Sequence, residues 1–314
     1  MALAIVAPST KVDVSVLVPA KDEAANLPLF LEQAAAAFRT ADATFEVIVI
    51  DDGSTDDTWA VLGALVDQYP FVRRVRHRRQ RGIADALRTG FLQARGDVLV
   101  FYPADLQYKP EDIPRLVAPI LAGESDMVTG YKQGKYEKAF VSRVYNRLSR
   151  ILFEIPVRDL NSVKAYRREI MEQLPVRPDW HRYMIVIAAA QGFTVTEIPV
   201  PLYPRHAGRS KFGKSRIVVG MLDMLSVWFE LRFGRKPLML FGTLGSLLFL
   251  LGVLTGIVAL LMRFVIPPYQ GFRPLLNLIE VCLILGFLSF ATGLLGEQIA
   301  GIRAELREMR RDDE

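Results

Sequence analysis

Short apolar runs alternate with longer amphipathic stretches along the first two thirds of the chain. The apolar runs are rich in β-branched residues and predict strands at 12–19, 45–50, 71–77, 97–102, 126–130, 162–166 and 194–200. Apolar residues at helical spacing predict helices between them, near 24–38, 56–67, 83–94, 110–121 and 136–153. This alternation predicts an α/β fold with a mostly parallel sheet flanked by helices.

The last third of the chain has a different pattern. Residues 237–262 contain no charged side chain, and residues 274–296 contain only Glu280. A membrane-spanning helix needs about 20 predominantly apolar residues, so we expect two spans joined by a short turn. Upstream, residues 215–235 carry apolar side chains at helical spacing and predict an interfacial juxtamembrane helix. The side chains at that spacing are Ile217, Met221, Leu225, Trp228 and Phe229.

These patterns divide the chain into three expected parts: a first domain at 1–214, the interfacial helix at 215–235, and a two-span hairpin with a short tail at 236–314. Basic residues flank both spans, whereas the turn between the spans holds arginines only at its edges, Arg263 and Arg273. By the positive-inside rule, the first domain and both termini are expected in the cytoplasm. Glycines in the first span would permit close helix contacts, and hence a homo-oligomer.

Charge and cysteine content narrow the function further. The formal net charge is +5, which suits attraction to a membrane surface. No nucleic-acid-binding motif accompanies this charge, so we expect no nucleic-acid partner. The single cysteine, Cys282, lies in the second predicted span and allows no intrachain disulfide.

Two predicted strands end in acidic loops. The first strand leads to Asp22 and Glu23, and the second leads directly to Asp51 and Asp52. Open α/β sheets hold ligands at the carboxyl ends of their strands. Carboxylates there suit a ligand with hydroxyl and imide N–H donors, such as a ribose with a uracil or guanine base. The glycine-rich phosphate loops of dinucleotide-binding and P-loop proteins do not occur in the sequence.

The same acidic turn also has a purely structural interpretation. Ser54 or Thr55 can cap the helix that begins near Asp56, and a capped turn of this kind needs no ligand. An arginine-rich run at 73–81 is likewise open to two interpretations. It forms a solvated or membrane-facing basic patch, or it brings Arg81 to a diphosphate.

Four motifs then occur in a fixed order: Val18-Pro19 with Asp22-Glu23, Asp51-Asp52-Gly53-Ser54, Gly82 to Asp97, and Ala104-Asp105-Leu106-Gln107. Together they resemble the inverting nucleotide-sugar glycosyltransferases of the GT-A fold, family 2. Three later segments narrow the resemblance to dolichyl-phosphate mannose synthases and bacterial polyprenyl-phosphate glycosyltransferases. These segments are Asp159-Leu160-Asn161-Ser162, His181-Arg182-Tyr183 and the run from Arg205 to Lys211. The resemblance covers about residues 12–214, and the predicted hairpin matches relatives that carry one.

The resemblance implies transfer of one sugar, with inversion, from a UDP- or GDP-sugar to an undecaprenyl or dolichyl phosphate. The implied nucleotide-sugar-binding residues are Pro19, Glu23, Asp52, Arg81, Asp105 and Gln107. Asp159 and Asp105 are the implied catalytic residues, and Asp105 with Gln107 would hold Mg²⁺ or Mn²⁺. The acceptor phosphate would be bound by Lys132, Lys138, Ser142, His181, Arg205, Arg209, Ser210 and Lys211.

One departure from the family pattern affects the metal site. Pro103 stands where the family usually has the first aspartate of an Asp-x-Asp motif, so Asp105 must supply the carboxylate. We therefore expect the metal to bind more weakly than in the family. Two alternatives stay open: a scaffold that binds nucleotide-sugar without turnover, and a transferase to a hydroxyl acceptor. A processive polysaccharide synthase is disfavoured, because it needs more spans and a Q-x-x-R-W motif that the chain lacks.

Overall fold

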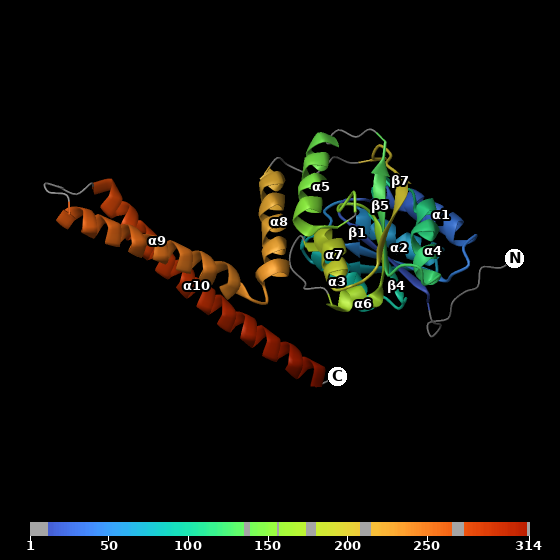
Figure 1. Cartoon of the computed structure of the whole chain (residues 1–314). Coiled ribbons are helices and arrows are strands. Elements are labelled where there is room, and N and C mark those ends of the chain that lie inside the picture. The colour runs from blue at the N-terminus through green and yellow to red at the C-terminus, as the bar shows by residue number, and fades with distance from the viewer. Residues whose placement is uncertain are drawn as a thin grey trace. The chain divides into compact units, whose positions relative to one another are not determined.

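The computed structural model describes residues 12–134, 139–155, 157–173, 180–207, 215–265 and 273–312. The chain forms two compact units, Met1–Met224 and Leu225–Glu314 (Figure 1). The boundary between the units lies inside helix α8 (Ser215–Phe233), whereas the sequence-based division puts it before that helix.

The first unit is built on a seven-stranded sheet with the strand order β3-β2-β1-β4-β6-β5-β7. Every neighbouring pair is parallel except the two pairs that involve β6, so β6 alone runs against the other strands of this sheet. The prediction of a mostly parallel sheet is confirmed. The strands are β1 (Val14–Ala20), β2 (Phe45–Asp51), β3 (Val72–Arg76), β4 (Val98–Phe101), β5 (Met127–Gln133), β6 (Lys164–Arg167) and β7 (Val195–Pro201).

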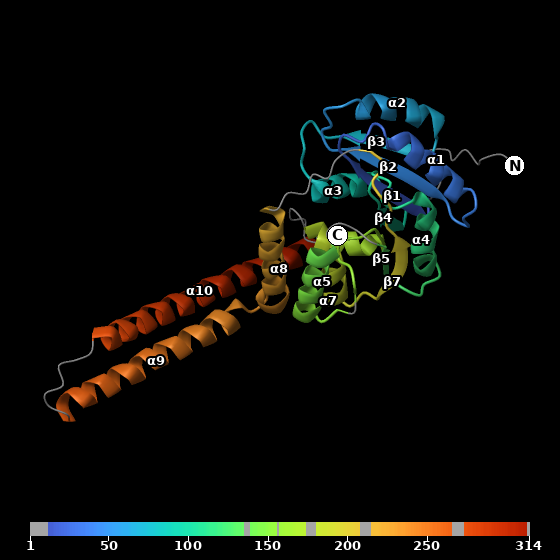
Figure 2. The ribbon, with the colours of Figure 1, turned by 90° about the horizontal axis from the view of Figure 1, so that it is seen from above.

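Helices cover both faces of the sheet. Figure 2 shows α1, α2 and α4 on one side and α3 and α7 on the other. The first-unit helices before α8 are α1 (Leu27–Phe38), α2 (Thr58–Gln68), α3 (Ile83–Gln93), α4 (Ile113–Leu121), α5 (Ala139–Phe153), α6 (Arg168–Gln173) and α7 (Met184–Ala190). Two short 3₁₀ helices, η1 (Pro110–Asp112) and η2 (Trp180–Tyr183), precede α4 and α7.

The central strands are continuously apolar because both of their faces are covered. Val16 and Val49 are fully buried and belong to the core beneath α1, α2 and α4. Leu17 and Ile50 point to the opposite face, where Gly90 of α3 lets that helix approach them closely. Each fully buried side chain of this size contributes roughly 1.5–3 kcal/mol of burial free energy. The sheet is thus a rigid base for the loops at its edge.

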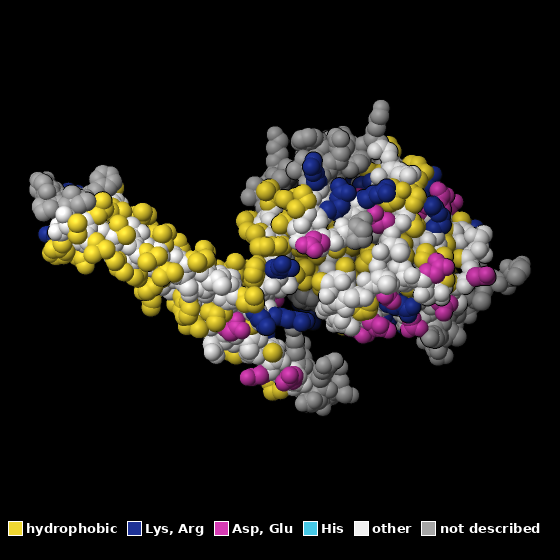
Figure 3. All heavy atoms as spheres, in the orientation of Figure 1, with side chains coloured by type: hydrophobic (Ala, Val, Ile, Leu, Met, Phe, Trp, Pro, Cys, Tyr) yellow, Lys and Arg dark blue, Asp and Glu magenta, His cyan; other side chains and the backbone are white. Residues whose placement is uncertain are grey.

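The second unit contains two long helices, α9 (Pro237–Val265) and α10 (Arg273–Asp312). Their most apolar 18-residue windows have mean hydropathies of 2.5 and 2.2, yet only 11% and 17% of these windows are buried. Figure 3 shows apolar side chains over most of the visible surface of the two helices, except at the C-terminal end of α10, where charged side chains gather. Exposed apolar surface of this extent is unfavourable in water and suits lipid. The chain is a membrane protein, and α10 continues through the predicted tail to Asp312.

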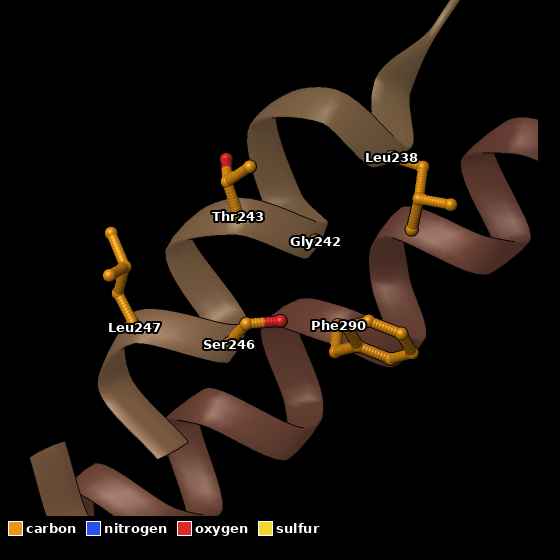
Figure 4. A pocket seen from close by; sticks show the side chains of 6 residues that line it. All are labelled: Leu238, Gly242, Thr243, Ser246, Leu247 and Phe290. Carbon is orange, nitrogen blue, oxygen red and sulfur yellow. The ribbon is translucent and has the colours of Figure 1, made fainter. Parts of the chain in front are cut away.

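Close backbone contact holds α9 and α10 together. A Cβ atom on Gly245 would lie 2.6 Å from Phe290 N, and one on Gly286 would lie 2.6 Å from Phe249 N. Only glycine permits this approach, which resembles the small-residue packing of membrane helices. The glycines of the first span thus serve the contact inside the hairpin. Figure 4 shows an apolar groove beside that contact, lined by Leu238, Gly242, Thr243, Ser246, Leu247 and Phe290.

Candidate active site

The loops after β1 and β2 are hydrogen-bonded to each other at one edge of the sheet. The Asp22 N–H donates to Ser54 Oγ (2.9 Å), and the Thr55 N–H donates to Asp22 Oδ1 (2.8 Å). The Glu23 N–H likewise donates to Thr58 Oγ1 (2.9 Å). Asp22 adopts a φ of 54°, a conformation that these contacts stabilise. The two acidic loops therefore form one structural unit.

The prediction that Ser54 or Thr55 caps the following helix is wrong. Helix α2 begins at Thr58 with Asp57 as its N-cap residue, and no side chain caps it. Ser54 Oγ instead accepts the Asp22 N–H of the β1 loop. Asp56 Oδ1 accepts the Thr58 N–H (3.0 Å) and supports the start of the helix.

Pro19 and Glu23, both predicted donor-binding residues, lie on β1 and in the loop after it. Pro19 pairs with Ile50 of β2. The Glu23 carboxylate accepts a hydrogen bond from Asn26 Nδ2 (2.5 Å). The same amide nitrogen lies 3.4 Å from Ala207 O, so this loop reaches the segment that follows β7.

Asp52 is buried, and both of its carboxylate oxygens accept hydrogen bonds. Oδ1 accepts from the Arg81 N–H and Oδ2 from the Gly82 N–H, each at 2.8 Å. His77 Nδ1 lies 2.8 Å from Oδ1, and His77 Nε2 lies 2.9 Å from Thr89 Oγ1. Asp52 therefore anchors the 77–82 segment against β2. Its predicted contact with the nucleotide stays a prediction.

Three side chains of the arginine-rich run are paired with carboxylates, and the first of these is Arg73, whose Nη1 lies 3.4 Å from Glu46 Oε2. Arg76 Nε lies 3.0 Å from Asp51 Oδ2 at the end of β2. Arg81 Nε donates to Asp85 Oδ2 (3.1 Å) at the start of α3, and the Arg81 side chain is 52% exposed. The predicted approach of Arg81 to a diphosphate stays a prediction, as does the alternative of a basic patch.

Asp105, Gln107 and Arg205 meet at the end of β4. Arg205 Nη2 lies 2.8 Å from Asp105 Oδ2 and 3.4 Å from Gln107 Oε1. The Gln107 N–H donates to Asp105 Oδ1 (3.2 Å), and the Tyr203 N–H donates to Gln107 O (2.9 Å). Burial raises the pKa of the Asp105 carboxyl, and the Arg205 guanidinium partly opposes this rise. A predicted acceptor residue thus contacts the two predicted metal ligands.

The oxygens of this cluster fit a divalent cation. The Asp105 carboxylate and the Gln107 amide oxygen both converge on a single positive group, the Arg205 guanidinium. Both are hard oxygen donors of the kind that Mg²⁺ and Mn²⁺ prefer. No cluster of three or more metal-binding His, Cys, Asp or Glu side chains occurs in the described part of the chain. Such an ion would therefore take its other ligands from substrate and water.

Asp159 lies in a second polar cluster, formed by the loop before β6. Lys132 Nζ lies 3.2 Å from Asp159 Oδ2 and donates to Asn161 O (2.9 Å). Glu197 Oε1 accepts the N–H groups of Arg158 (2.6 Å) and Asp159 (3.3 Å). Burial raises the pKa of the Glu197 carboxyl. Asp159, predicted as catalytic, and Lys132, predicted for the acceptor, are therefore brought together.

A buried lysine and His181 complete this second cluster. Lys164 Nζ donates to Leu160 O (3.2 Å) and to His181 O (3.3 Å). His181 is 7% exposed, and its ring packs edge-on against Phe101 with centroids 6.2 Å apart. The loops that carry the two clusters are also in contact, because Ser162 Oγ donates to Tyr108 OH (3.2 Å).

Other predicted acceptor residues lie outside the described residues, namely Lys138, Arg209, Ser210 and Lys211. Ser142 belongs to α5, but its side chain is also outside the described part. His77 and Lys164 were missed by the sequence analysis. A charged residue at the start of an otherwise apolar strand was the available signal for Lys164, whereas nothing in the sequence separates His77 from the arginines around it.

Comparison with known proteins identifies relatives along nearly the whole chain. The family model described as Glycosyl transferase family 2 matches residues 15–180. A dodecaprenyl-phosphate galacturonate synthase of Rhizobium johnstonii is 30% identical over 93% of this chain and 89% of its own length. An undecaprenyl-phosphate 4-deoxy-4-formamido-L-arabinose transferase of Klebsiella pneumoniae is 30% identical, over 94% of this chain and 90% of its own.

Solved structures support the fold. The glucosyl-3-phosphoglycerate synthase of Mycobacterium tuberculosis, crystallised with Mn²⁺, UDP and glucosyl-3-phosphoglycerate, matches with a TM-score of 0.55 and 22% identity. That match covers 70% of this chain and 80% of the synthase chain. A second crystal structure of the synthase, with Mg²⁺ and UDP, gives a TM-score of 0.54 and 22% identity over 68% of this chain and 80% of that one.

Proposed function

The chain belongs to glycosyl transferase family 2, and from this membership we propose that it transfers one sugar from a nucleotide-sugar to a polyprenyl phosphate. The chain is an inverting glycosyltransferase, because that is the chemistry of its family. The finer assignments of acceptor, metal, site residues and orientation are part of the proposal.

The choice of acceptor rests on the share of this chain that is similar to its relatives. The matches to polyprenyl-phosphate sugar transferases extend over 93% and 94% of this chain. They therefore include the membrane hairpin as well as the first unit, which we call the catalytic unit. A hairpin of exposed apolar helices suits an enzyme whose acceptor is a lipid. These relatives handle different sugars, so we leave the sugar of this chain unassigned.

The donor would bind at the sheet edge where the β1 and β2 loops meet. The 77–82 segment, anchored by Asp52, gives this edge a fixed wall. The Glu23 carboxylate and the backbone beside Pro19 lie at the same edge and would accept hydrogen bonds from ribose and base. Arg81 would reach the diphosphate after leaving Asp85.

Asp105 and Gln107 would hold Mg²⁺ or Mn²⁺, which when bound neutralises charge on the leaving diphosphate. The Arg205 guanidinium supplies a positive charge to the same Asp105 and Gln107 oxygens. Once Asp105 and Gln107 bind the ion, Arg205 would pair with a phosphate oxygen through charge-assisted hydrogen bonds. This supports our assignment of Arg205 to the acceptor phosphate.

The transfer step does not need a strong general base from the protein. An acceptor phosphate oxygen is already anionic at neutral pH and forms the new bond to the anomeric carbon. The bond from that carbon to the diphosphate oxygen breaks, and its electron pair leaves with the nucleoside diphosphate. Attack in line with the leaving group inverts the anomeric centre. Asp159 would orient the sugar, while Lys132 and His181 would position the acceptor phosphate.

The catalytic unit is proposed to lie in the cytoplasm, as the positive-inside rule predicts. Helix α8 supports a position at the membrane surface. Val219, Met221 and Leu222 are exposed apolar residues on its catalytic-unit half, and the first span begins four residues after its end.

A substrate screen with purified full-length protein tests the proposal. Detergent-solubilised enzyme is incubated with labelled UDP- and GDP-sugars and short polyprenyl phosphates, with and without Mg²⁺ or Mn²⁺. We expect a metal-dependent, organic-extractable product from one donor, and none from Asp105→Ala. Nucleotide-sugar binding without any transfer would instead identify a non-catalytic scaffold. Transfer to a hydroxyl-bearing lipid but not to a phosphate would identify a different acceptor class.

A further inference from the structure

Lys164 is a buried cation that the proposed transfer step does not use. The residue is 1% exposed and opens β6, directly opposite Phe101 of β4. Its Nζ lies 5.9 Å from the centre of the Phe101 ring. Burying an ammonium group is costly unless several partners compensate it, and an apolar residue would fill the same space without that cost.

The partners of Lys164 come from two separate segments of the site. The ammonium group donates to Leu160 O in the loop that carries Asp159, and to His181 O in η2. Leu160 immediately follows Asp159, while the second acceptor is the carbonyl of His181 itself. One side chain therefore connects two residues that the sequence analysis had placed in the reaction independently.

Three charged side chains act on the Lys164 ammonium group. Burial lowers the pKa of its ammonium group from 10.5 to about 7, and the Asp159 carboxylate partly opposes this change. Lys132 of β5 and Arg182 of η2 lower the pKa further. The His181 ring packs against Phe101, the β4 residue that lies opposite Lys164. The lysine is thus poised between its charged and neutral forms near neutral pH.

We propose that Lys164 is a positioning residue of the transfer reaction, which fixes the Asp159 loop against His181 by donating to one carbonyl of each segment. The inference rests on the proposed function. Lys164 itself touches neither substrate. Its ammonium group holds Asp159 and His181 in the relative geometry that the acceptor phosphate and the sugar require.

This role has a specific kinetic consequence. A misplaced positioning group slows the chemical step much more than it weakens the binding of a substrate held elsewhere. We expect kcat to fall by about tenfold to a hundredfold in Lys164→Met, whereas the donor KM changes by about twofold or less. As the pH rises through about 7 the ammonium group loses its proton, and its two charge-assisted hydrogen bonds become weaker bonds from a neutral amine, so wild-type kcat should fall on that alkaline side.

The experiment compares full-length wild type with Lys164→Met, Lys164→Arg and the matched control Tyr166→Phe. Tyr166 lies two residues along the same strand, is fully buried, and its hydroxyl has no hydrogen-bond partner among the described residues. Steady-state kinetics are recorded from pH 6 to pH 9 for every protein. The arginine cannot lose its proton in this range, so its residual activity should lack the alkaline fall, whereas Tyr166→Phe should retain it.

A stability measurement tests the buried cation independently of activity. Between about pH 7 and 10.5 the unfolded chain binds a proton that folded Lys164 releases, so unfolding free energy should rise with pH across this window. This rise should be absent in Lys164→Met. An unchanged kcat, or an unchanged alkaline fall, in both lysine variants would overturn the proposal, as would failure of both to fold. If wild type were inactive but its unfolding free energy still rose with pH, the result would count against the proposed function, while the titration of buried Lys164 would still be supported.

Discussion

Replacing Arg205 with alanine removes the guanidinium that contacts the buried Asp105 carboxylate. The contact distance is 2.8 Å, Asp105 is 8% exposed, and the Arg205 side chain is about a fifth exposed at 22%. A hydrogen bond to a charged group is worth about 1.5–3 kcal/mol, and partial exposure favours the lower half of that range. We therefore expect Arg205→Ala to lose about 2 kcal/mol at neutral pH, or about 4–8 °C in Tm for a domain of this size.

The loss of stability in Arg205→Ala should be larger at neutral pH than in acid. The folded-state pKa of Asp105 is raised, so this carboxylate destabilises the fold increasingly as pH rises through that pKa. Arg205 offsets the effect only while Asp105 is ionised. The stability difference between wild type and Arg205→Ala should therefore be full at neutral pH and shrink as acid protonates Asp105.

Mg²⁺ provides a second readout that needs no turnover. A divalent cation held by Asp105 and Gln107 replaces the positive charge that Arg205 supplies. Mg²⁺ should therefore raise the Tm of Arg205→Ala more than that of wild type. Both Tm values are measured on full-length protein in detergent by circular dichroism, from pH 4.5 to pH 8, with and without the ion.

Arg115→Ala is the matched control. Arg115 Nη1 lies 2.6 Å from Asp112 Oδ1, another buried carboxylate whose pKa burial raises. Because the Arg115 side chain is 56% exposed, this variant should show a smaller loss with the same pH dependence, without the extra stabilisation by Mg²⁺. A Tm loss in Arg205→Ala that is constant with pH, or equal Mg²⁺ effects in all three proteins, would refute the reasoning about this cluster.

Three further changes test other parts of the account. Pro103→Asp should lower the Mg²⁺ concentration that gives half-maximal activity, because it adds a second carboxylate to the loop, and an unchanged titration would show that position 103 is remote from the ion. Asp52→Ala should weaken nucleotide binding by releasing the 77–82 segment, and normal calorimetric affinity for both UDP and GDP would argue against that donor pocket. Gly286→Leu should lower the Tm of the hairpin by several degrees, since a Cβ there would lie 2.6 Å from Phe249 N. Gly301→Leu, with no neighbour within 4 Å, should not lower it, and equal melting of the two variants would contradict the close packing of α9 and α10.

Most elements of the first unit followed from local pattern, although helix α6 was not predicted. The run predicted as a strand at 45–50 became β2 at Phe45–Asp51, because an apolar β-branched run bounded by turn residues carries its own signal. The reversed direction of β6, between β4 and β5, was not predictable in the same way. Strand order depends on contacts between distant segments, and periodicity contains no information about them.

In the candidate site, too, single residues were predictable from the sequence, whereas their contacts with distant residues were not. Asp105 and Arg205 were each identified by their motif, but their contact joins residues 100 positions apart and required the fold. Ser54 was assigned to the wrong partner for a related reason. Its local environment favoured a helix cap, whereas the Asp22 N–H of a separate loop occupies its hydroxyl in the folded chain.

Mass spectrometry of the lipid product tests the central claim most directly. The purified full-length protein is incubated with the donor selected by the screen and a short polyprenyl phosphate, and the extracted lipid is analysed together with its anomeric configuration by NMR. The account predicts a phosphate-linked product that has gained a single sugar residue, with the configuration opposite to that of the donor. A product with retained configuration, a chain of several sugars, or donor hydrolysis without any glycosylated lipid would contradict it.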